Sequence, residues 1–213
     1  MLLYLLRHGE TDWNVERRMQ GVSDQPLNSI GIAQAKALIP PLKGRPITTV
    51  YSSALSRARE PAKILADGLG GLPVREDERL AELDQGDIEG MVISEIQERH
   101  KDFWKVWRER PGDARVPGGE SLPELQARAW AAVEEIRDRH PEEMVVAVSH
   151  NLTITTLLCR VLGLELNAMR RIRQHNATIN LIEYDPARDW TIVTMNALAH
   201  LNGGITSEDK PYL

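Results

Sequence analysis

Two uninterrupted apolar runs stand out in the pattern of hydrophobic and polar positions along the chain. They cover residues 2–6 and 144–148, and each leads into a short polar segment with a histidine, His8 after the first run and His150 after the second. Runs of this length without polar interruptions are typical of central strands that are covered on both faces of a sheet. We therefore predict two buried strands, each of which presents a histidine at its end.

Weaker β patterns and several helical segments fill the rest of the chain. Short β-rich stretches occupy residues 48–51, the surroundings of Val74, and residues 178–184 and 190–195. Helices are predicted from apolar periodicity and from capping residues, and they cover 30–39, 55–67, 93–109, 121–139 and 153–162. Strands and helices therefore alternate over most of the sequence.

Capping residues mark several of the predicted helix ends. Asn28 offers an N-cap to the first long helix, and Pro40-Pro41 is expected to close it. Ser121 and Glu124 have the spacing of a capping box, in which each side chain accepts a hydrogen bond from the backbone near the other residue.

The alternation of strands and helices predicts the fold class. It favours an α/β fold, a three-layer sandwich in which helices cover both faces of a mostly parallel central sheet. No internal repeat, low-complexity tract or linker divides the chain, so we expect a single domain over residues 1–213. Residues 203–213 are expected to form a loose polar tail.

Composition and charge exclude several classes of function. The 213 residues carry a formal net charge of -5 and no strongly basic stretch, which gives no support for nucleic-acid binding. The first apolar run is too short for a signal peptide or a membrane span, so we expect a cytoplasmic protein without a membrane partner. A homodimer is compatible with the sequence, but the sequence does not decide the oligomeric state.

The charged residues near the strand ends point to an anionic ligand. In open α/β sheets, ligands bind beyond the carboxyl ends of the strands. His8 and His150 would meet there together with Arg7, and Arg57 lies in the first turn of the helix after a third strand. Gly9 lets the chain turn sharply beside the first histidine. Two arginines and two histidines in one crevice predict a site for a small phosphate monoester.

Several motifs resemble those of one known family. The segments, in order along the chain, are LLRHGETDWN (5–14), RMQGVSDQPLNSIGIAQAKAL (18–38), YSSALSRAREPA (51–62), RLAELDQGDIEG (79–90), GGES (118–121) and VAVSHN (146–151). They are similar to the signature blocks of the histidine phosphatase superfamily, which has the phosphoglycerate mutase-like fold. The resemblance spans about residues 2–200.

The resemblance implies a role for each matching residue. His8 would be the nucleophile that becomes phosphorylated, and Glu82 would be the general acid and base. The phosphoryl oxygens would be bound by Arg7, Arg57, His150 and Asn14. These residue types suit the chemistry, because a neutral imidazole is nucleophilic without a metal and guanidinium groups can neutralise the phosphoryl oxygens. We expect neither a metal nor a cofactor, since no zinc-like Cys/His spacing and no glycine-rich nucleotide loop is present.

The residues on the substrate side give a less definite prediction. The resemblance places Gln20 and Gly21 beside the substrate, and the block around Glu82 and the chain near His200 are similar to the metal-independent phosphoserine phosphatases of the family. That subgroup has a histidine where this chain has Gln85, whereas His200 matches the pattern. Phosphoserine is therefore the first candidate substrate, and sugar phosphates, phosphoglycerates and α-ribazole phosphate remain open.

Two residues depart from the family pattern near the pocket. Asn151 follows the second histidine where the family usually has glycine, and its tolerance of left-handed backbone geometry would preserve the turn. Its side chain is also placed to reach the ligand. Pro61 stands where the family usually has threonine, and it removes a backbone donor from the helix that follows Arg57.

Three functions are compatible with these residues. A phosphatase that acts on a small phosphomonoester is favoured, because the segment between Glu82 and His150 is shorter than in the mutases of the family. The alternatives are a 2,3-bisphosphoglycerate-dependent phosphoglycerate mutase and a non-catalytic scaffold that binds phosphate. The scaffold is disfavoured because the nucleophile, both arginines and the acid are all present.

The remaining aromatic residues and histidines are given structural interpretations. Phe103, Trp104 and Trp107 form an aromatic cluster that we assign to the core in preference to a lid or an oligomer contact. Three histidines in polar surroundings are expected to be solvated, namely His100, His140 and His175.

Overall fold

Strands β1 (Leu2–Arg7) and β4 (Met144–Ser149) lie side by side at the centre of a six-stranded sheet. The computed structural model describes residues 1–201, and the predicted polar tail at 203–213 lies outside them. The strand order is β3-β2-β4-β1-β5-β6, and the other strands are β2 (Ile47–Ser52), β3 (Val74–Glu76), β5 (Ile179–Asp185) and β6 (Asp189–Ala197). The pairings among β1 to β4 are parallel, while β5 and β6 are antiparallel to their neighbours. The predicted mostly parallel sheet is therefore confirmed.

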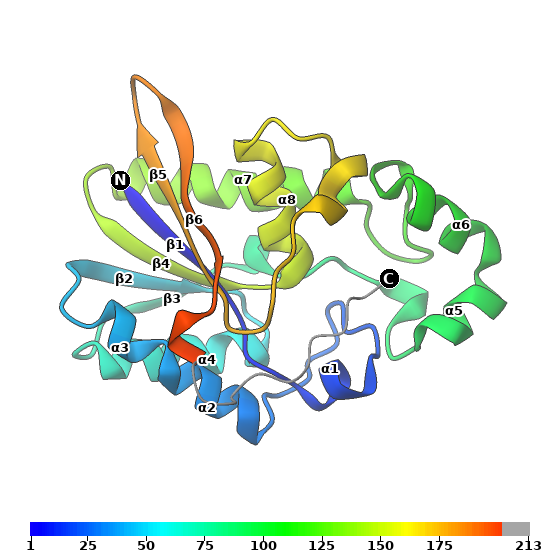
Figure 1. Ribbon diagram of the computed structural model, residues 1–213, viewed down its shortest axis with the longest axis horizontal. Coiled ribbons are helices and arrows are strands. Elements are labelled where there is room, and N and C mark those ends of the chain that lie inside the picture. Colours follow the sequence, from blue (N-terminus) through cyan, green and yellow to red (C-terminus); the bar gives the residue numbers. More distant parts are fainter. Residues whose placement is uncertain (202–213) are drawn as a thin grey trace.

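Helices cover both faces of this sheet (Figure 1). Helices α2 (Ser29–Ala37), α3 (Ile39–Leu42) and α4 (Ser56–Gly68) lie on one face, and α7 (Leu122–Arg139) and α8 (Asn151–Val161) lie on the other. Beyond one end of the sheet are α1 (Asp12–Glu16), α5 (Ile93–Arg99) and α6 (Lys101–Glu109). Short 3₁₀ turns complete the fold at Glu78–Leu80 (η1), Gly86–Ile88 (η2), Pro111–Asp113 (η3), Leu166–Arg171 (η4) and Ala199–Leu201 (η5).

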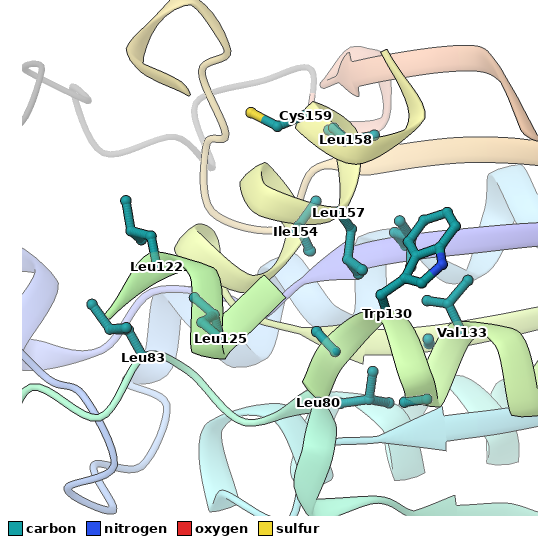
Figure 2. Packing of buried hydrophobic residues seen from close by; sticks show 14 of the residues in the cluster. Leu80, Leu83, Leu122, Leu125, Trp130, Val133, Ile154, Leu157, Leu158 and Cys159 are labelled. Carbon is teal, nitrogen blue, oxygen red and sulfur yellow. The ribbon is translucent and has the colours of Figure 1, made fainter. Parts of the chain in front are cut away.

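The central strand β1 is buried on both faces because its side chains alternate between two hydrophobic clusters. Leu3 and Leu5 pack into the cluster under α7 and α8, whereas Tyr4 and Leu6 pack into the cluster under α2 to α4. Figure 2 shows part of the first cluster, with side chains of α7 such as Trp130 and side chains of α8 such as Leu157. This burial on both faces explains why the sequence of β1 is apolar throughout.

Helix ends account for most differences from the sequence-based expectations. The segment predicted as one helix over 93–109 breaks at His100 into α5 and α6. Pro40 and Pro41 do not close α2 but lie within the short helix α3, near whose beginning proline is tolerated because those N–H groups have no partner within the helix. Helix α8 begins at Asn151, earlier than expected, and Asn151 does not have the positive φ that was considered for it.

One histidine predicted to be solvated is buried. His140 is 6% exposed, and its Nε2 lies 3.0 Å from the hydroxyl oxygen of Tyr51, at the end of α7. The prediction was wrong because it rested on the polar residues next to His140 in the sequence, whereas the fold places the distant, buried Tyr51 against its ring. Within residues 1–201, none of the helices combines the length and the apolar character needed to cross a bilayer.

Candidate active site

The two histidines at the strand ends lie next to each other. Strands β1 and β4 are parallel, with Arg7 opposite Ser149, so the next residues, His8 and His150, leave the sheet at the same level. The backbone N–H of His8 donates to the carbonyl of Ser149 at 3.0 Å, and the two imidazole centroids are 5.2 Å apart. The register of the sheet therefore brings together two side chains that are far apart in the sequence.

A backbone carbonyl fixes the tautomer of His8. Its Nδ1 lies 2.6 Å from the carbonyl oxygen of Gly9, an acceptor, so Nδ1 carries the proton and the lone pair is on Nε2. Burial holds the pKa of His8 well below its usual value of 6.5, and the nearby charges of Arg57 and Arg7 lower the pKa further. The bond to Gly9 acts in the opposite direction. His8 is therefore neutral at physiological pH, with the lone pair of Nε2 free to act as a nucleophile.

A close approach of two backbone segments sets the position of His8. A Cβ atom on Gly9 would lie 2.5 Å from the carbonyl oxygen of Gly31, in the first turn of α2. A Cβ atom on Gly31 would in turn lie 2.1 Å from the carbonyl oxygen of Glu10. Only glycine fits at these two positions, so α2 holds the backbone turn that follows His8.

His150 is fully enclosed, and among the described residues neither of its ring nitrogens has a hydrogen-bond partner. Burial and then the charge of Arg57 hold the pKa of His150 well below its usual value. Buried polar atoms without partners are rare in proteins, and an anion beside the ring would satisfy one of them.

Arg57 reaches the site from the first turn of α4. The residue has no exposed surface, and its Nη1 and Nη2 donate to the carbonyl oxygens of Ser23, at 2.8 Å, and Gly21, at 2.5 Å. Burial lowers the pKa of Arg57 to about 10, and neighbouring carboxylates, Glu82 foremost, act against that shift. Arg57 is therefore still a cation at neutral pH.

Glu89 positions the loop that holds Arg57. Its carboxylate accepts hydrogen bonds from the backbone N–H groups of Val22, at 2.7 Å, and Ser23, at 2.9 Å. Gly21 begins this loop with a φ of +50°, and a Cβ atom there would lie 2.0 Å from a carboxylate oxygen of Glu89. Gly21, predicted to lie beside the substrate, thus also shapes the backbone that orients Arg57.

Arg7 is tied to a loop that the sequence patterns did not single out. Its Nη1 donates to the carbonyl oxygen of Gln174 at 2.6 Å. The side chain of Gln174 is buried and bonded to Asn180 and Thr178, and Asn176 donates to the carbonyl oxygen of Gly9 at 3.1 Å. The loop before β5 therefore supports both the side chain of Arg7 and the backbone turn at His8 and Gly9.

Glu82 lies at the N-terminus of α8. Its carboxylate accepts from the backbone N–H groups of Leu83, at 2.9 Å, and of Leu152 and Thr153, each at 3.2 Å. The single hydroxyl proton of Thr153 is shared between the carbonyl oxygen of Ala81, at 2.8 Å, and the carboxylate of Glu82, at 3.3 Å. The positive end of the α8 dipole therefore faces the carboxylate.

Arg128 of α7 holds the backbone of the segment that carries Glu82. Its guanidinium donates to the carbonyl oxygens of Arg79 and Ala81 at 2.8 Å and to that of Glu82 at 2.7 Å. The same guanidinium binds the carboxylate of Glu120 through Nε and Nη2. Since Nε, Nη1 and Nη2 of Arg128 are all engaged, the acid segment is fixed against α7.

The substrate side of the site is a cavity of about 390 Å³ above His8. Among the residues predicted for the site, the cavity is lined by Arg7, His8, Asn14, Gln20, Gly21, Arg57, Glu82, Gln85 and Asn151. His150 lies beside His8 but does not itself line the cavity. His200 does not line it either, since its Nε2 is bonded to the carbonyl oxygen of Ala177 at 2.9 Å. The structure thus brings all the predicted residues except His200 to one place.

The remaining wall of the cavity is largely apolar. It includes the aromatic cluster of α6, Phe103, Trp104 and Trp107, whose side chains are half-buried. The prediction that these rings belong to the core holds only in part, because they pack against it at one side and face the cavity at the other. His175, expected to be solvated, is half-buried and lines the cavity as well.

Comparison with known proteins agrees with this geometry. The sequence profile of the histidine phosphatase superfamily (branch 1) matches residues 3–198. The chain belongs to this superfamily. It is 37% identical over 204 residues, 94% of each chain, to a protein of Yersinia pestis named probable phosphoglycerate mutase GpmB.

Solved structures of the superfamily share the fold. YhfR of Bacillus stearothermophilus matches with a TM-score of 0.89 and 33% identity, over 94% of this chain and 98% of that one. A mycobacterial glucosyl-3-phosphoglycerate phosphatase in complex with VO3 matches with a TM-score of 0.84 and 32% identity, over 92% and 99%. A phosphoserine phosphatase variant of Entamoeba histolytica in complex with phosphoserine matches with a TM-score of 0.83 and 25% identity, over 94% and 98%. The family resemblance and the fold class predicted from the sequence are thus confirmed.

Proposed function

We propose that this histidine phosphatase superfamily member is a metal-independent phosphomonoesterase that acts through a phosphohistidine on His8. The observation that carries the proposal is the state of His8, whose Nδ1 proton is held by Gly9 and whose neutral Nε2 lies beside two guanidinium groups. A nucleophile prepared in this way needs no metal for its activation. We also propose a cytoplasmic location, as expected from the short first apolar run of the sequence.

In the first step, Nε2 of His8 attacks phosphorus and the ester P–O bond breaks. The Nδ1 proton stays on the ring and is donated to the carbonyl oxygen of Gly9, so the imidazole can take on positive charge while the N–P bond forms. The leaving alkoxide takes a proton from Glu82, which lines the same cavity. The products are the free alcohol and a phosphohistidine.

In the second step, water replaces the alcohol. Glu82, now a carboxylate, takes a proton from the water, and the oxygen of the water attacks phosphorus. The N–P bond then breaks, which returns neutral His8 and releases inorganic phosphate. Throughout, Arg7 and Arg57 neutralise charge on the equatorial phosphoryl oxygens, with Asn14 at the same wall of the cavity. His150 would serve as a further partner, since both of its ring nitrogens have none in the described part of the chain.

Phosphoserine is the candidate substrate that the sequence puts first. The amide oxygen of Gln85 lines the cavity, is buried, and has no hydrogen-bond partner within residues 1–201, so it can accept from a substrate N–H or O–H. A superfamily neighbour is a phosphoserine phosphatase. Phosphates of sugars, of glyceric acid and of α-ribazole belong in the same test, because neighbours include a glucosyl-3-phosphoglycerate phosphatase and an α-ribazole phosphatase.

The proposal is tested by phosphate release in the presence of EDTA. We expect EDTA-treated protein to hydrolyse at least one monoester of this panel and the His8→Ala variant to lose at least a hundredfold in kcat. Rapid acid-free quenching with a radiolabelled ester should leave an alkali-stable, acid-labile label on the wild-type protein and none on the variant. Turnover that survives the loss of His8, or that disappears with EDTA and returns with a divalent cation, would contradict the mechanism.

A mutase is the second candidate, because the relative at 37% identity is named a probable phosphoglycerate mutase. Conversion of 3-phosphoglycerate to 2-phosphoglycerate, with a trace of 2,3-bisphosphoglycerate, tests it directly. Interconversion without release of phosphate would assign the chain to the mutases. A protein that binds phosphate and shows neither reaction would be the non-catalytic scaffold.

A further inference from the structure

Six apolar side chains form an open wall of the cavity beyond the phosphate-binding residues. They come from four segments of the chain and are Met19, Ile93, Phe103, Trp104, Trp107 and Leu152. None of these side chains is fully buried, although each lines the cavity. The cavity that contains the nucleophile therefore continues into a space walled by large apolar groups.

Helix α6 contributes its aromatic rings to the cavity and little else to the core. None of its residues is buried, and Phe103 and Trp107 lie together with ring centroids 5.7 Å apart. The part of each half-buried ring that stays uncovered is unfavourable in water, at about 25 cal/mol for each Å². An apolar group that entered the cavity would cover it.

The end of α6 is held by hydrogen bonds from Arg170. The guanidinium of Arg170 donates to the carbonyl oxygens of Trp107, at 2.7 Å, and Arg108, at 3.0 Å, in the last turn of the helix. These bonds satisfy carbonyls that otherwise have no partner at a helix end. The backbone that carries Trp107 is therefore tied to the loop of Arg170 beside the cavity.

The charged groups of the lining do not match an amino acid, and in this the structure favours a different alcohol from serine, the candidate that the sequence puts first. Glu82 is the one carboxylate among the lining residues, and the proposed mechanism uses it for proton transfer. An ammonium group on the substrate would thus lack an acidic partner next to five lining arginines, Arg7, Arg18, Arg57, Arg170 and Arg173. An uncharged apolar group meets no such conflict.

We infer that the alcohol released by this enzyme is apolar, with an aromatic ring or a branched hydrocarbon that packs against the wall of α6. The inference rests on the proposed function, since it names the leaving group of the same reaction. The phosphoryl group occupies the end of the cavity near His8 and Arg57, and the ester oxygen lies toward Glu82. The apolar body of the substrate extends from there to Phe103 and Trp107.

The test compares esters whose alcohols differ in apolar surface and not in leaving-group chemistry. Ethyl, benzyl and naphthylmethyl phosphate are all monoesters of primary alcohols, as is phosphoserine. We expect kcat/KM to rise about tenfold or more from ethyl to benzyl phosphate, because one ring is buried, and to be lowest for phosphoserine. Equal values for the esters, or a preference for phosphoserine, would overturn the inference.

Variants of α6 show whether the preference comes from this wall. Trp107→Ala and Phe103→Ala should each reduce the benzyl-to-ethyl ratio of kcat/KM severalfold. The matched control is Val106→Ala, on the same helix, since Val106 is 40% exposed and does not line the cavity. A variant that merely folded poorly would lower both rates and leave the ratio unchanged. A ratio that stays at the wild-type value in both cavity variants would contradict the assignment of the wall.

Binding of phosphonates separates the inference from the proposed function. Benzylphosphonate and ethylphosphonate cannot be hydrolysed, and titration calorimetry measures their affinities without turnover. If no ester is hydrolysed but benzylphosphonate binds about tenfold more tightly, the proposed reaction fails and the apolar subsite stands. If esters are hydrolysed but the two phosphonates bind equally, the reaction stands and the subsite fails.

Discussion

His8 and His150 show how single residues are prepared by their surroundings. Each is buried beside cationic guanidinium groups, and in both cases burial is the main cause of a pKa well below 6.5. The neutral form of His8 is the nucleophilic one, so the same burial that suits the chemistry also disfavours the folded state in acid. Function and stability are thus linked through the same two side chains.

This link predicts how stability depends on pH. Below about pH 6.5 the unfolded chain binds a proton at each of these histidines and the folded chain does not, so the free energy of unfolding falls as pH falls from the unfolded pKa toward the folded one. Between roughly pH 7.5 and pH 5.5, each histidine should lower the free energy of unfolding by on the order of 1 kcal/mol. Urea denaturation of His150→Gln at the two pH values should show a decrease smaller than that of the wild type by this amount. Equal decreases would contradict the pKa assignment.

The sequence predicted the residues at strand ends better than those in loops. His8, Arg7 and His150 follow apolar runs, and the parallel register alone brings them together. Gln174 and Asn176 carry no such signal, because they act through a backbone carbonyl and a side-chain amide in a polar loop. Their contribution becomes visible only when β5 is placed next to β1.

At the scale of elements, the N-terminus of α8 positions the carboxylate of Glu82. The first backbone N–H groups of a helix have no partner within it, and here two of them bind Glu82. The hydroxyl of Thr153 adds a bond from the same turn. The carboxylate is thus attached to an element that begins directly after His150, so acid and histidine share one support.

Replacing Thr153 with valine should slow the release of poor leaving groups. The valine keeps the shape of the side chain and removes the hydroxyl that Glu82 shares with the carbonyl of Ala81, which still binds Arg128. A lost hydrogen bond is worth about 1 kcal/mol, so we expect kcat for an alkyl ester to fall about fivefold. para-Nitrophenyl phosphate, whose leaving group needs little protonation, should be affected much less. Thr153→Ser should restore the rate for the alkyl ester. An equal loss for both esters would indicate a structural effect and not a positioning role.

The contact between α2 and the turn of the nucleophile makes a second prediction at this scale. Helix propensity alone favours Gly31→Ala by about 1 kcal/mol. The added Cβ, however, would lie 2.1 Å from the backbone oxygen of Glu10, and overpacking of this kind costs about 1–3 kcal/mol. We therefore expect a net loss of stability in urea denaturation and a lower kcat, since the Gly9 carbonyl would shift.

The control for this substitution is Gly68→Ala at the end of α4. Its added Cβ would meet the terminal methyl of Ile39, a side chain that can move aside. That variant should keep the wild-type kcat and stay within about 1 kcal/mol of the wild-type stability. Wild-type stability of Gly31→Ala would show that the two backbone segments are free to separate.

Helices were predicted well where packing follows the sequence period and less well where it does not. Helix α7, with its capping box at Ser121, has the expected bounds. The break at His100 was missed, because residues 93–109 are periodic on both sides of it while the backbone turns there to bring α6 over the cavity. A requirement that arises from tertiary structure has no local signature.

At the scale of the whole molecule, the distribution of charge matters more than its sum. The chain carries a formal net charge of -5, yet the residues that line the cavity include five arginines and one carboxylate. A concave site of one sign attracts a ligand of the opposite sign even when the protein as a whole repels it. The cavity is therefore expected to attract anionic ligands, such as the proposed phosphomonoester, before any specific contact forms.

This field predicts a dependence on salt. Raising the NaCl concentration from roughly 0.02 M to 0.5 M shortens the Debye length to a few ångströms, and KM for a phosphomonoester should rise about threefold or more. The buried groups around His8 are screened far less, so kcat should change little. Steady-state kinetics with ionic strength as the variable provide the measurement, and a KM independent of salt would rule out steering by the cavity.

The wall of α5 and α6 is built from a part of the chain that contains none of the phosphoryl-binding residues. This part leaves the body of the fold after η2 and returns to it at α7. The residues proposed to transfer the phosphoryl group are held instead by β1, α4, α7 and α8, and they are His8, Arg7, Arg57 and Glu82. Most of the apolar wall therefore lies in one excursion of the chain, apart from the residues proposed to transfer the phosphoryl group, and Met19 and Leu152 complete it from other segments. A different segment between residues 91 and 121 is therefore expected to change the preferred alcohol while the residues proposed for phosphoryl transfer stay in place.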